Sequence, residues 1–194
     1  HLFERYFTTS KEVEVTDRLI EGLLLTMKKE APRVMADANN YQARANIMWA
    51  GMVAHNNSCG VGRTQDWASH DIEHELSALY DCAHGAGLAV VFPAWMTYVM
   101  NHDVNRFAQV AVRVWGCQMD FEHPENTAKE GIECLRAFWK SIGMPSNFAE
   151  LGANEEDIPK MAKTACYGDV REGNIGGFVS LNQEDLENIY RLML

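Results

Sequence analysis

The sequence lacks the features of a membrane-spanning or disordered protein. No stretch approaches about 20 uninterrupted apolar residues, the length that a helix needs to cross a bilayer. Basic residues are scarce, since 17 Lys and Arg stand against 27 Asp and Glu, for a formal net charge of −10. Such a surface repels nucleic acids and anionic membranes, so we expect neither as a partner. With 47% apolar and 23% charged residues, the 194-residue chain has the composition of one globular domain.

Cysteine is sparse and irregularly placed. The five cysteines are odd in number, widely spaced and mostly embedded in helical patterns (Cys59, Cys82, Cys117, Cys134 and Cys166). This arrangement does not provide the framework of a small domain held together by disulfide bonds. It indicates reduced thiols and therefore a cytoplasmic location.

Alternating apolar and polar residues, the pattern of a half-buried strand, are almost missing as well. Apolar residues recur instead at helical spacing, as they do between Leu19 and Met27. Near the end of the chain, Ser180 and Gln183 have the spacing of a capping box for a last helix. We therefore predict an all-α fold, a bundle of eight or nine helices around one core, with at most a short strand pair.

Three histidines form the most informative pattern. His70 and His74 lie one turn apart on the same face of a predicted helix. In one straight helix, His84 would lie about 21 Å beyond His70, too far away to share an ion. The segment 83–87 (Ala-His-Gly-Ala-Gly) is a natural helix break, however, so His84 can open a new helix folded back beside the first. A chelating trio of neutral imidazoles, suited to Zn²⁺ or Fe²⁺, then becomes possible.

The same histidines also match a shorter pattern. Residues 70–74 read H-x-x-E-H, as in inverted zinc proteases, where both histidines bind zinc and Glu73 would activate a water molecule. This match leaves His84 without a role and offers no downstream glutamate helix for a third ligand. A zinc metalloprotease-like hydrolase is therefore the alternative hypothesis, and a helical binding module with incidental histidines is a third.

Longer segments around the histidines resemble the iron-containing alcohol dehydrogenases, and in particular the butanol dehydrogenases that use NADH or NADPH. The similarity extends over the whole chain and is concentrated in residues 66–70 (Asp-Trp-Ala-Ser-His), 83–89 (Ala-His-Gly-Ala-Gly-Leu-Ala) and 93–96 (Pro-Ala-Trp-Met). The implied fold is the all-helical, dehydroquinate synthase-like C-terminal domain of that family. The chain would then be a single metal-binding catalytic domain.

The resemblance also implies roles for the histidines. In the family, an Asp and a His four residues apart bind the metal together with two later histidines that are fourteen positions apart. By this match His1, His70 and His84 are metal ligands, and the family's aspartate would lie four residues before His1, outside this chain. His74 matches the non-ligand active-site histidine near the nicotinamide and the substrate, where an imidazole can relay the proton of the alcohol.

Other residues near these segments are left outside the predicted site. The remaining histidines stand beside polar loop residues and are interpreted as solvated surface groups (His55, His102 and His123). Aromatic side chains at helical spacing belong to a core more often than to a substrate pocket. Trp67, Phe92 and Trp95 are therefore not assigned to the site.

The activity implied by the resemblance is the interconversion of primary alcohols and aldehydes, with hydride transfer to or from NAD(P) at a divalent metal, Fe²⁺ or Zn²⁺. The full-length enzyme is implied to be a homodimer. Neither 60–62 nor 85–87, the two Gly-x-Gly segments, follows a predicted strand, so neither meets the condition for a dinucleotide phosphate turn. We therefore expect the N-terminal dinucleotide-binding domain to be absent from these residues, and the chain alone to be inactive.

Overall fold

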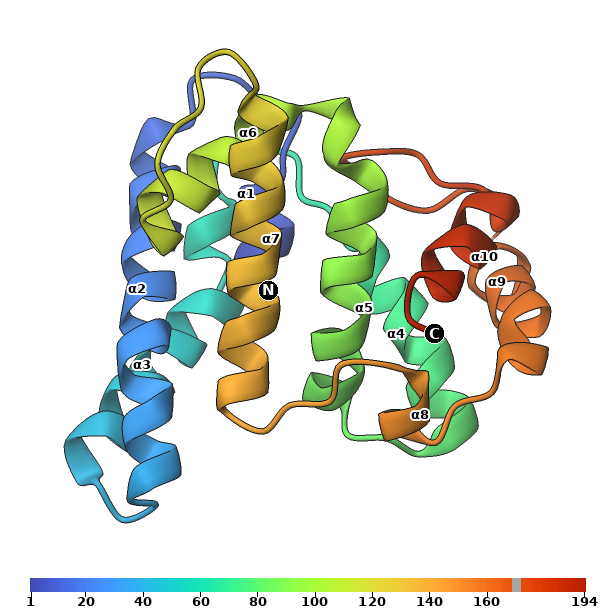
Figure 1. Cartoon of the computed structure of the whole chain (residues 1–194), viewed down its shortest axis with the longest axis horizontal. Coiled ribbons are helices and arrows are strands. Elements are labelled where there is room, and N and C mark those ends of the chain that lie inside the picture. The colour runs from blue at the N-terminus through green and yellow to red at the C-terminus, as the bar shows by residue number, and fades with distance from the viewer. Residues whose placement is uncertain (169–171) are drawn as a thin grey trace.

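The fold is all-helical, as predicted. A computed structural model describes residues 1–168 and 172–194 (Figure 1). Within these residues there are ten α-helices and no strand, with one isolated antiparallel bridge between Ile175 and Leu181. The helices are α1 (Leu2–Tyr6), α2 (Glu14–Ala36), α3 (Tyr41–His55), α4 (Ala68–Tyr80), α5 (His84–Val99), α6 (Val104–Val110), α7 (Pro124–Ser141), α8 (Phe148–Leu151), α9 (Ile158–Tyr167) and α10 (Gln183–Arg191). The count exceeds the prediction because one-turn helices such as α8 carry no periodic pattern.

Helix α5 is the centre of the arrangement. It packs against α4, α7 and α10, and α4 in turn packs against α9. Helices α2 and α3 pack together at one end of the molecule and α9 and α10 at the other, with α5 between them (Figure 1). The segment from Ala89 to Met96 of α5 is buried throughout. This burial explains why its sequence is an apolar run and not an amphipathic pattern.

A group of aromatic rings fixes the exit of α1 in the core. Phe7, which directly follows α1, is fully buried, and its ring centroid lies 4.4 Å from that of Phe107 and 5.4 Å from that of Trp95. Phe178 joins them from the C-terminal segment, 5.9 Å from Phe7. Phe92 also lies in this core, so the assignment of Phe92 and Trp95 to the core and not to a pocket is confirmed.

Two arginines with largely buried side chains hold the end of α1. Arg106 Nε donates to the carbonyl of Tyr6 at 2.8 Å, and Arg63 Nη1 donates to that of Arg5 at 2.7 Å. Both guanidinium groups also bind the carboxylate of Asp17 on α2, whose side chain is 4% exposed. Burial by itself would raise the pKa of Asp17, but the hydrogen bonds and charges of the two arginines outweigh burial and lower it. Carbonyl groups that α1 itself leaves unpaired are thereby satisfied.

The last helix begins with a capping box, but at other residues than predicted. Asn182 accepts from the backbone N–H of Asp185, and the Asp185 side chain accepts from the backbone N–H of Asn182. The predicted pair, Ser180 and Gln183, lies two residues earlier. The motif was right in kind, and its register was wrong because several residues in this segment are competent caps.

The cysteines are free thiols, which confirms the prediction of no disulfide framework. The Sγ atoms of Cys117 and Cys134 lie 3.9 Å apart without a bond. Burial, and secondarily the neighbouring Cys134, raises the pKa of Cys117 to about 12. Because the thiolate is the reactive form, Cys117 is an unreactive thiol at neutral pH.

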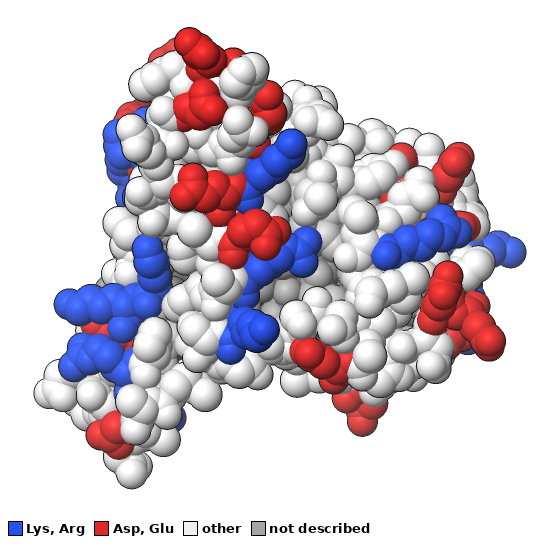
Figure 2. Space-filling view, viewed as in Figure 1, with Lys and Arg blue, Asp and Glu red and all other residues white. Residues whose placement is uncertain are grey.

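The surface combines mixed charges with an exposed apolar strip. On the face drawn in Figure 2, acidic and basic side chains are interspersed. Along α3, the side chains of Tyr41, Met48 and Met52 are exposed and share one helix face. In the part of the chain that the structure describes, no helix is long and apolar enough to cross a membrane.

The anchoring of α1 predicts a large effect of a single substitution. Asp17→Ala leaves two largely buried arginines without their counterion, so we expect a loss of about 3–5 kcal/mol in the free energy of unfolding. Urea unfolding followed by circular dichroism measures this loss. Glu14→Ala, at the exposed partner of Arg18 and Arg113, is the matched control and should change the unfolding midpoint little.

The lowered pKa of Asp17 also fixes the pH dependence of this contribution. A depressed pKa in the folded state contributes stability above the unfolded value of about 3.9, and this stability is lost as the pH falls through the folded value. Wild-type protein should therefore lose its advantage over Asp17→Ala in that acidic range. A difference between the two proteins that stays constant down to the lowest pH at which both fold would contradict this account.

Candidate functional site

Four histidines from three segments of the chain form one cluster. His1 precedes α1, His70 and His74 lie on α4, and His84 is the first residue of α5. The ring centroid of His70 lies 4.6 Å from that of His1 and 4.9 Å from that of His84. The ring of His74 lies 5.9 Å from His70 and 5.5 Å from His84. His70 is therefore the central member, and the predicted helix break before His84 is confirmed.

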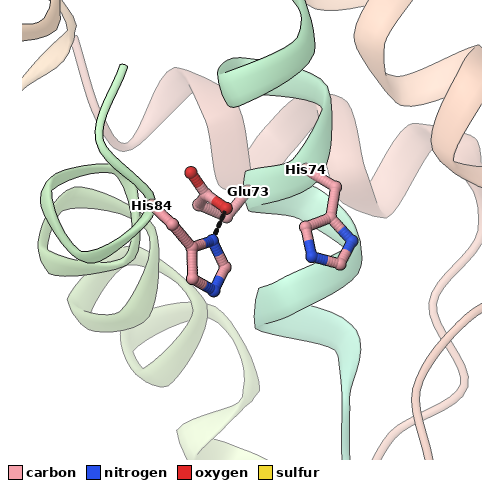
Figure 3. A group of neighbouring side chains, drawn as sticks. All are labelled: Glu73, His74 and His84. Atoms are coloured by element: carbon pink, nitrogen blue, oxygen red, sulfur yellow. Dashed lines mark hydrogen bonds and ion pairs between the residues drawn. The ribbon is translucent and has the colours of Figure 1, made fainter. Parts of the chain in front are cut away.

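Two of these histidines and a neighbouring glutamate have atoms that could bind a metal especially close together. Ligand atoms of Glu73, His74 and His84 lie within 4.8 Å of one another. Figure 3 shows the carboxylate of Glu73 turned toward His84, with the ring of His74 standing apart from it. Among the residues that the structure describes, His1 and His70 stand outside this tight group. The four predicted residues are thus brought together, with His1 and His84 both in contact with His70.

Buried carboxylates lie against two of the imidazole rings. Glu4 on α1 accepts a hydrogen bond from the backbone N–H of His70 at 3.0 Å, and its second oxygen lies against Nδ1 of His70. Glu73 on α4 pairs in the same way with Nδ1 of His84. Sequence analysis gave Glu4 no role and considered Glu73 only as a protease base. Each glutamate follows a predicted ligand by three residues, a spacing that could have marked them.

His70 has a ring nitrogen without a partner. The residue is 7% exposed, and within the described part of the chain neither ring nitrogen makes a hydrogen bond, although Nδ1 lies against the Glu4 carboxylate. Buried polar atoms in native proteins are almost always satisfied. A neutral imidazole nitrogen in such a position fits a metal ion as its missing partner.

Two further rings lie against this cluster of four histidines, and sequence analysis assigned neither to the site. The ring of Trp67 lies 5.7 Å from that of His1 and 5.3 Å from that of His70, and the guanidinium of Arg5 stacks on it at 4.9 Å. His55 is exposed, as predicted, but its ring also lies 3.9 Å from that of His1. The contacts with His1 join segments distant in the sequence, so no local pattern predicts them, whereas Trp67 and His70 are only three residues apart.

The first turn of α4 is held in place by a buried carboxylate. Oδ1 of Asp66 accepts from the backbone N–H groups of Gly177 and Phe178, at 2.6 and 3.0 Å, and Oδ2 accepts from that of Ala68 at 3.2 Å. Burial raises the pKa of Asp66 despite these hydrogen bonds. The C-terminal segment is thereby tied to the start of the helix that carries His70.

Comparison with protein families and their members gives a consistent result. The whole chain, residues 1–194, matches the model of the Fe-containing alcohol dehydrogenase family, C-terminal. It is 38% identical over 194 residues to a probable NADH-dependent butanol dehydrogenase 1 of Bacillus subtilis, which covers 100% of this chain and 49% of that protein. It is 36% identical over 192 residues to NADH-dependent butanol dehydrogenase A of Clostridium acetobutylicum, covering 98% of this chain and 49% of that protein.

Solved structures agree. NADH-dependent butanol dehydrogenase A of Thermotoga maritima matches with a TM-score of 0.91 at 35% identity, over 100% of this chain and 49% of that one. An aldehyde reductase from E. coli matches with a TM-score of 0.92 at 29% identity, over 100% of this chain and 50% of that one. The chain spans about half the length of these relatives, and their names give no support to the protease hypothesis. The chain belongs to the Fe-containing alcohol dehydrogenase family and corresponds to its C-terminal domain.

Proposed function

We propose that this chain is the metal-binding half of an NAD(P)-dependent alcohol dehydrogenase of the butanol dehydrogenase type, which interconverts primary alcohols and aldehydes. Relatives named as NADH-dependent butanol dehydrogenases support the substrate class and the cofactor. The observation that carries the proposal is the buried ring of His70, which has an unpartnered nitrogen and lies in contact with His1 and His84.

His1, His70 and His84 are the proposed ligands of the metal. Two imidazoles on one ion, each with a nitrogen at about 2.0–2.1 Å, place their ring centroids roughly 4.5–5.2 Å apart for bond angles between 90° and the tetrahedral value. The separations of 4.6 Å for His1 and His70 and 4.9 Å for His70 and His84 lie in this range. The separations of His74 from His70 and His84, 5.9 and 5.5 Å, exceed it. These centroid distances support His74 as a neighbour of the metal and not as a ligand, whereas the close ligand atoms of Glu73, His74 and His84, within 4.8 Å of one another, support the opposite assignment. We favour the first because it gives the buried, unpartnered ring of His70 its partner.

The chain's own residues would then orient the substrate and move its proton. A bound divalent metal such as Fe²⁺ or Zn²⁺ makes an alcohol hydroxyl more acidic and a carbonyl carbon more electrophilic, and a nicotinamide exchanges the hydride. The ring of His74 is exposed and lies beside two proposed ligands, so it can take the hydroxyl proton and pass it to solvent. Trp67, against His1 and His70, covers one side of the cluster with an apolar ring.

The nicotinamide site is assigned to a domain beyond these residues. Residues 58–60 form a 3₁₀ turn, and Gly85 and Gly87 lie inside α5, so in the described structure neither Gly-x-Gly segment connects a strand to a helix. A phosphate turn needs that connection, which brings backbone N–H groups and a helix N-terminus to the pyrophosphate. The matched relatives, twice as long as their aligned parts, have room for such a domain.

Metal binding tests the ligand set directly. We expect the chain to bind one Zn²⁺ or Co²⁺ ion. His70→Ala should raise the dissociation constant by at least about 100-fold, since loss of a residue that only hydrogen-bonds to a metal ligand already lowers metal affinity about 10–100-fold. His74→Ala should have a much smaller effect, and the exposed His123→Ala is the control. Competition with a chromophoric chelator measures the constants.

A different pattern of losses would mean that other residues bind the metal. If His74→Ala weakens binding as strongly as His84→Ala, and His1→Ala leaves it unchanged, the metal binds at the tight group of Glu73, His74 and His84. No binding at all by the wild-type chain would overturn the proposed metal site.

Catalysis should require a second half. We expect the chain alone, with metal and NADH or NADPH, to give no measurable turnover of butanol or butanal. Hydride transfer needs the donor carbon within about 3–3.5 Å of the nicotinamide ring, and the described residues offer no phosphate turn to hold that ring. Mixed with the N-terminal half of the B. subtilis relative, the chain should gain activity, and His70→Ala should abolish it. Robust turnover by the chain alone would show that the cofactor site lies within these residues and that its assignment to another domain is wrong.

A further inference from the structure

We propose that Glu73 is a positioning residue: its buried carboxylate fixes the ring of His84 so that the Nε2 atom of that ring faces the metal. The inference rests on the function proposed above, because it requires His84 to be a ligand. It adds a specific residue, and a glycine that makes room for it, to the machinery of that site.

Both oxygens of Glu73 are already engaged. The side chain is fully buried, its Oε2 pairs with Nδ1 of His84, and its Oε1 accepts the hydroxyl of Ser77 on the next turn of α4. The same hydroxyl also lies 3.2 Å from the carbonyl oxygen of Cys82. The carboxylate is therefore held at both ends, and Figure 3 shows it directed toward α5.

His84 depends on this contact more than His70 depends on its own. The side chain of His84 is 42% exposed, whereas that of His70 is 9% exposed and enclosed by packing. An exposed ring at the first position of a helix is free to rotate unless a hydrogen bond fixes it. Glu73 supplies that bond from the neighbouring helix.

The contact also decides which nitrogen is free. A carboxylate only accepts hydrogen bonds, so the proton of a neutral His84 ring must reside on Nδ1. Nε2 then keeps its lone pair and is the nitrogen available to a metal. Carboxylate–imidazole pairs of this kind fix the tautomer and ring orientation of metal-binding histidines and raise their basicity.

Gly87 shows that the fold makes room for this carboxylate. A Cβ atom added to Gly87 would lie 2.3 Å from Oε1, 2.7 Å from Cγ and 2.9 Å from Cδ of Glu73. Glycine inside a helix is destabilising by roughly 0.5–1 kcal/mol relative to alanine, and Gly87 lies within regular α5. The close approach of Glu73 is the physical reason for glycine here. Gly85, two residues earlier, has nothing within 4 Å of such a Cβ.

Glu73 could instead be a ligand, because one of its oxygens lies within 4.8 Å of ligand atoms of His74 and His84. Its geometry argues against that role. An ion at Glu73 would have to share a fully buried carboxylate whose two oxygens already pair with Ser77 and His84. The two roles also differ in the effect of a neutral acceptor at this position.

The experiment measures Zn²⁺ dissociation constants of the 194-residue chain by chelator competition, together with the visible spectrum of the Co²⁺ form. Glu73→Ala should lower the affinity for Zn²⁺ by about 10–100-fold and alter the spectrum of the Co²⁺ form. Glu73→Gln keeps an oxygen that accepts from Nδ1, and because a neutral acceptor is roughly half as strong as a charged one, its loss should stay within about tenfold. Thermal unfolding without metal separates these effects from a general loss of structure.

A second pair of variants leaves residue 73 as glutamate and changes only the space around it. Gly87→Ala should push the Glu73 carboxylate aside and lower the affinity for Zn²⁺. Gly85→Ala, the matched control in the same turn, should leave that affinity unchanged. In the Glu73→Ala background, Gly87→Ala should have no further effect, since the displaced group is gone. Additive losses from these two substitutions would mean that Gly87 acts through something other than Glu73.

Several outcomes overturn the proposal. If Glu73→Ala binds Zn²⁺ as tightly as wild type, the positioning role is wrong while the proposed function stands. If Glu73→Gln and Glu73→Ala lose affinity equally, the carboxylate is a ligand and the positioning role is again wrong. If the wild-type chain binds no metal, both the inference and the metal site on which it rests are wrong.

Discussion

The carboxylate of Asp17 is buried between two arginines, and both arginines also donate to the last carbonyl groups of α1. A helix of five residues has almost no stability of its own, because nucleation is unfavourable and few hydrogen bonds follow it. Its position is therefore decided by this arrangement and by the burial of Phe7 directly after it. Every site residue that α1 contributes, His1 at its start and Glu4 in its first turn, depends on that anchoring.

Two glutamates connect α1 to the other helices of the site. Glu4 pairs with a histidine of α4, and Glu73 of α4 pairs with the histidine that opens α5. Each of these two helices thus places a carboxylate against a histidine of another helix, so α1, α4 and α5 are linked through the cluster. Buried carboxylates are unfavourable unless hydrogen bonds compensate for lost water, and here the compensating groups are backbone and hydroxyl donors together with the imidazoles. The arrangement thus stabilises both the carboxylates and the orientation of the rings.

The sequence was informative wherever the signal was local. Helical periodicity indicated the fold class, and the run of small residues at 83–87 predicted the break that lets His84 turn back toward His70. The long resemblance supplied His1, which no spacing rule would have joined to a histidine 69 positions away. The contacts of Glu4 with His70 and of His55 and Trp67 with His1 were not predicted, because each joins segments distant in the sequence. The reason for Gly87 was not predicted either, since a glycine needed for close packing looks the same in a sequence as one that ends a helix.

Contacts between residues far apart in the sequence hold the elements that carry the site. Arg106 reaches Tyr6 across 100 residues, and Asp66 closes a further loop of 111 residues to Gly177. Loops of this length form late, because their closure entropy must be overcome before the contacts at their ends contribute. The complete histidine cluster is therefore a property of the folded chain, because the rings of His1 and His70 meet only when segments 69 positions apart in the sequence come together.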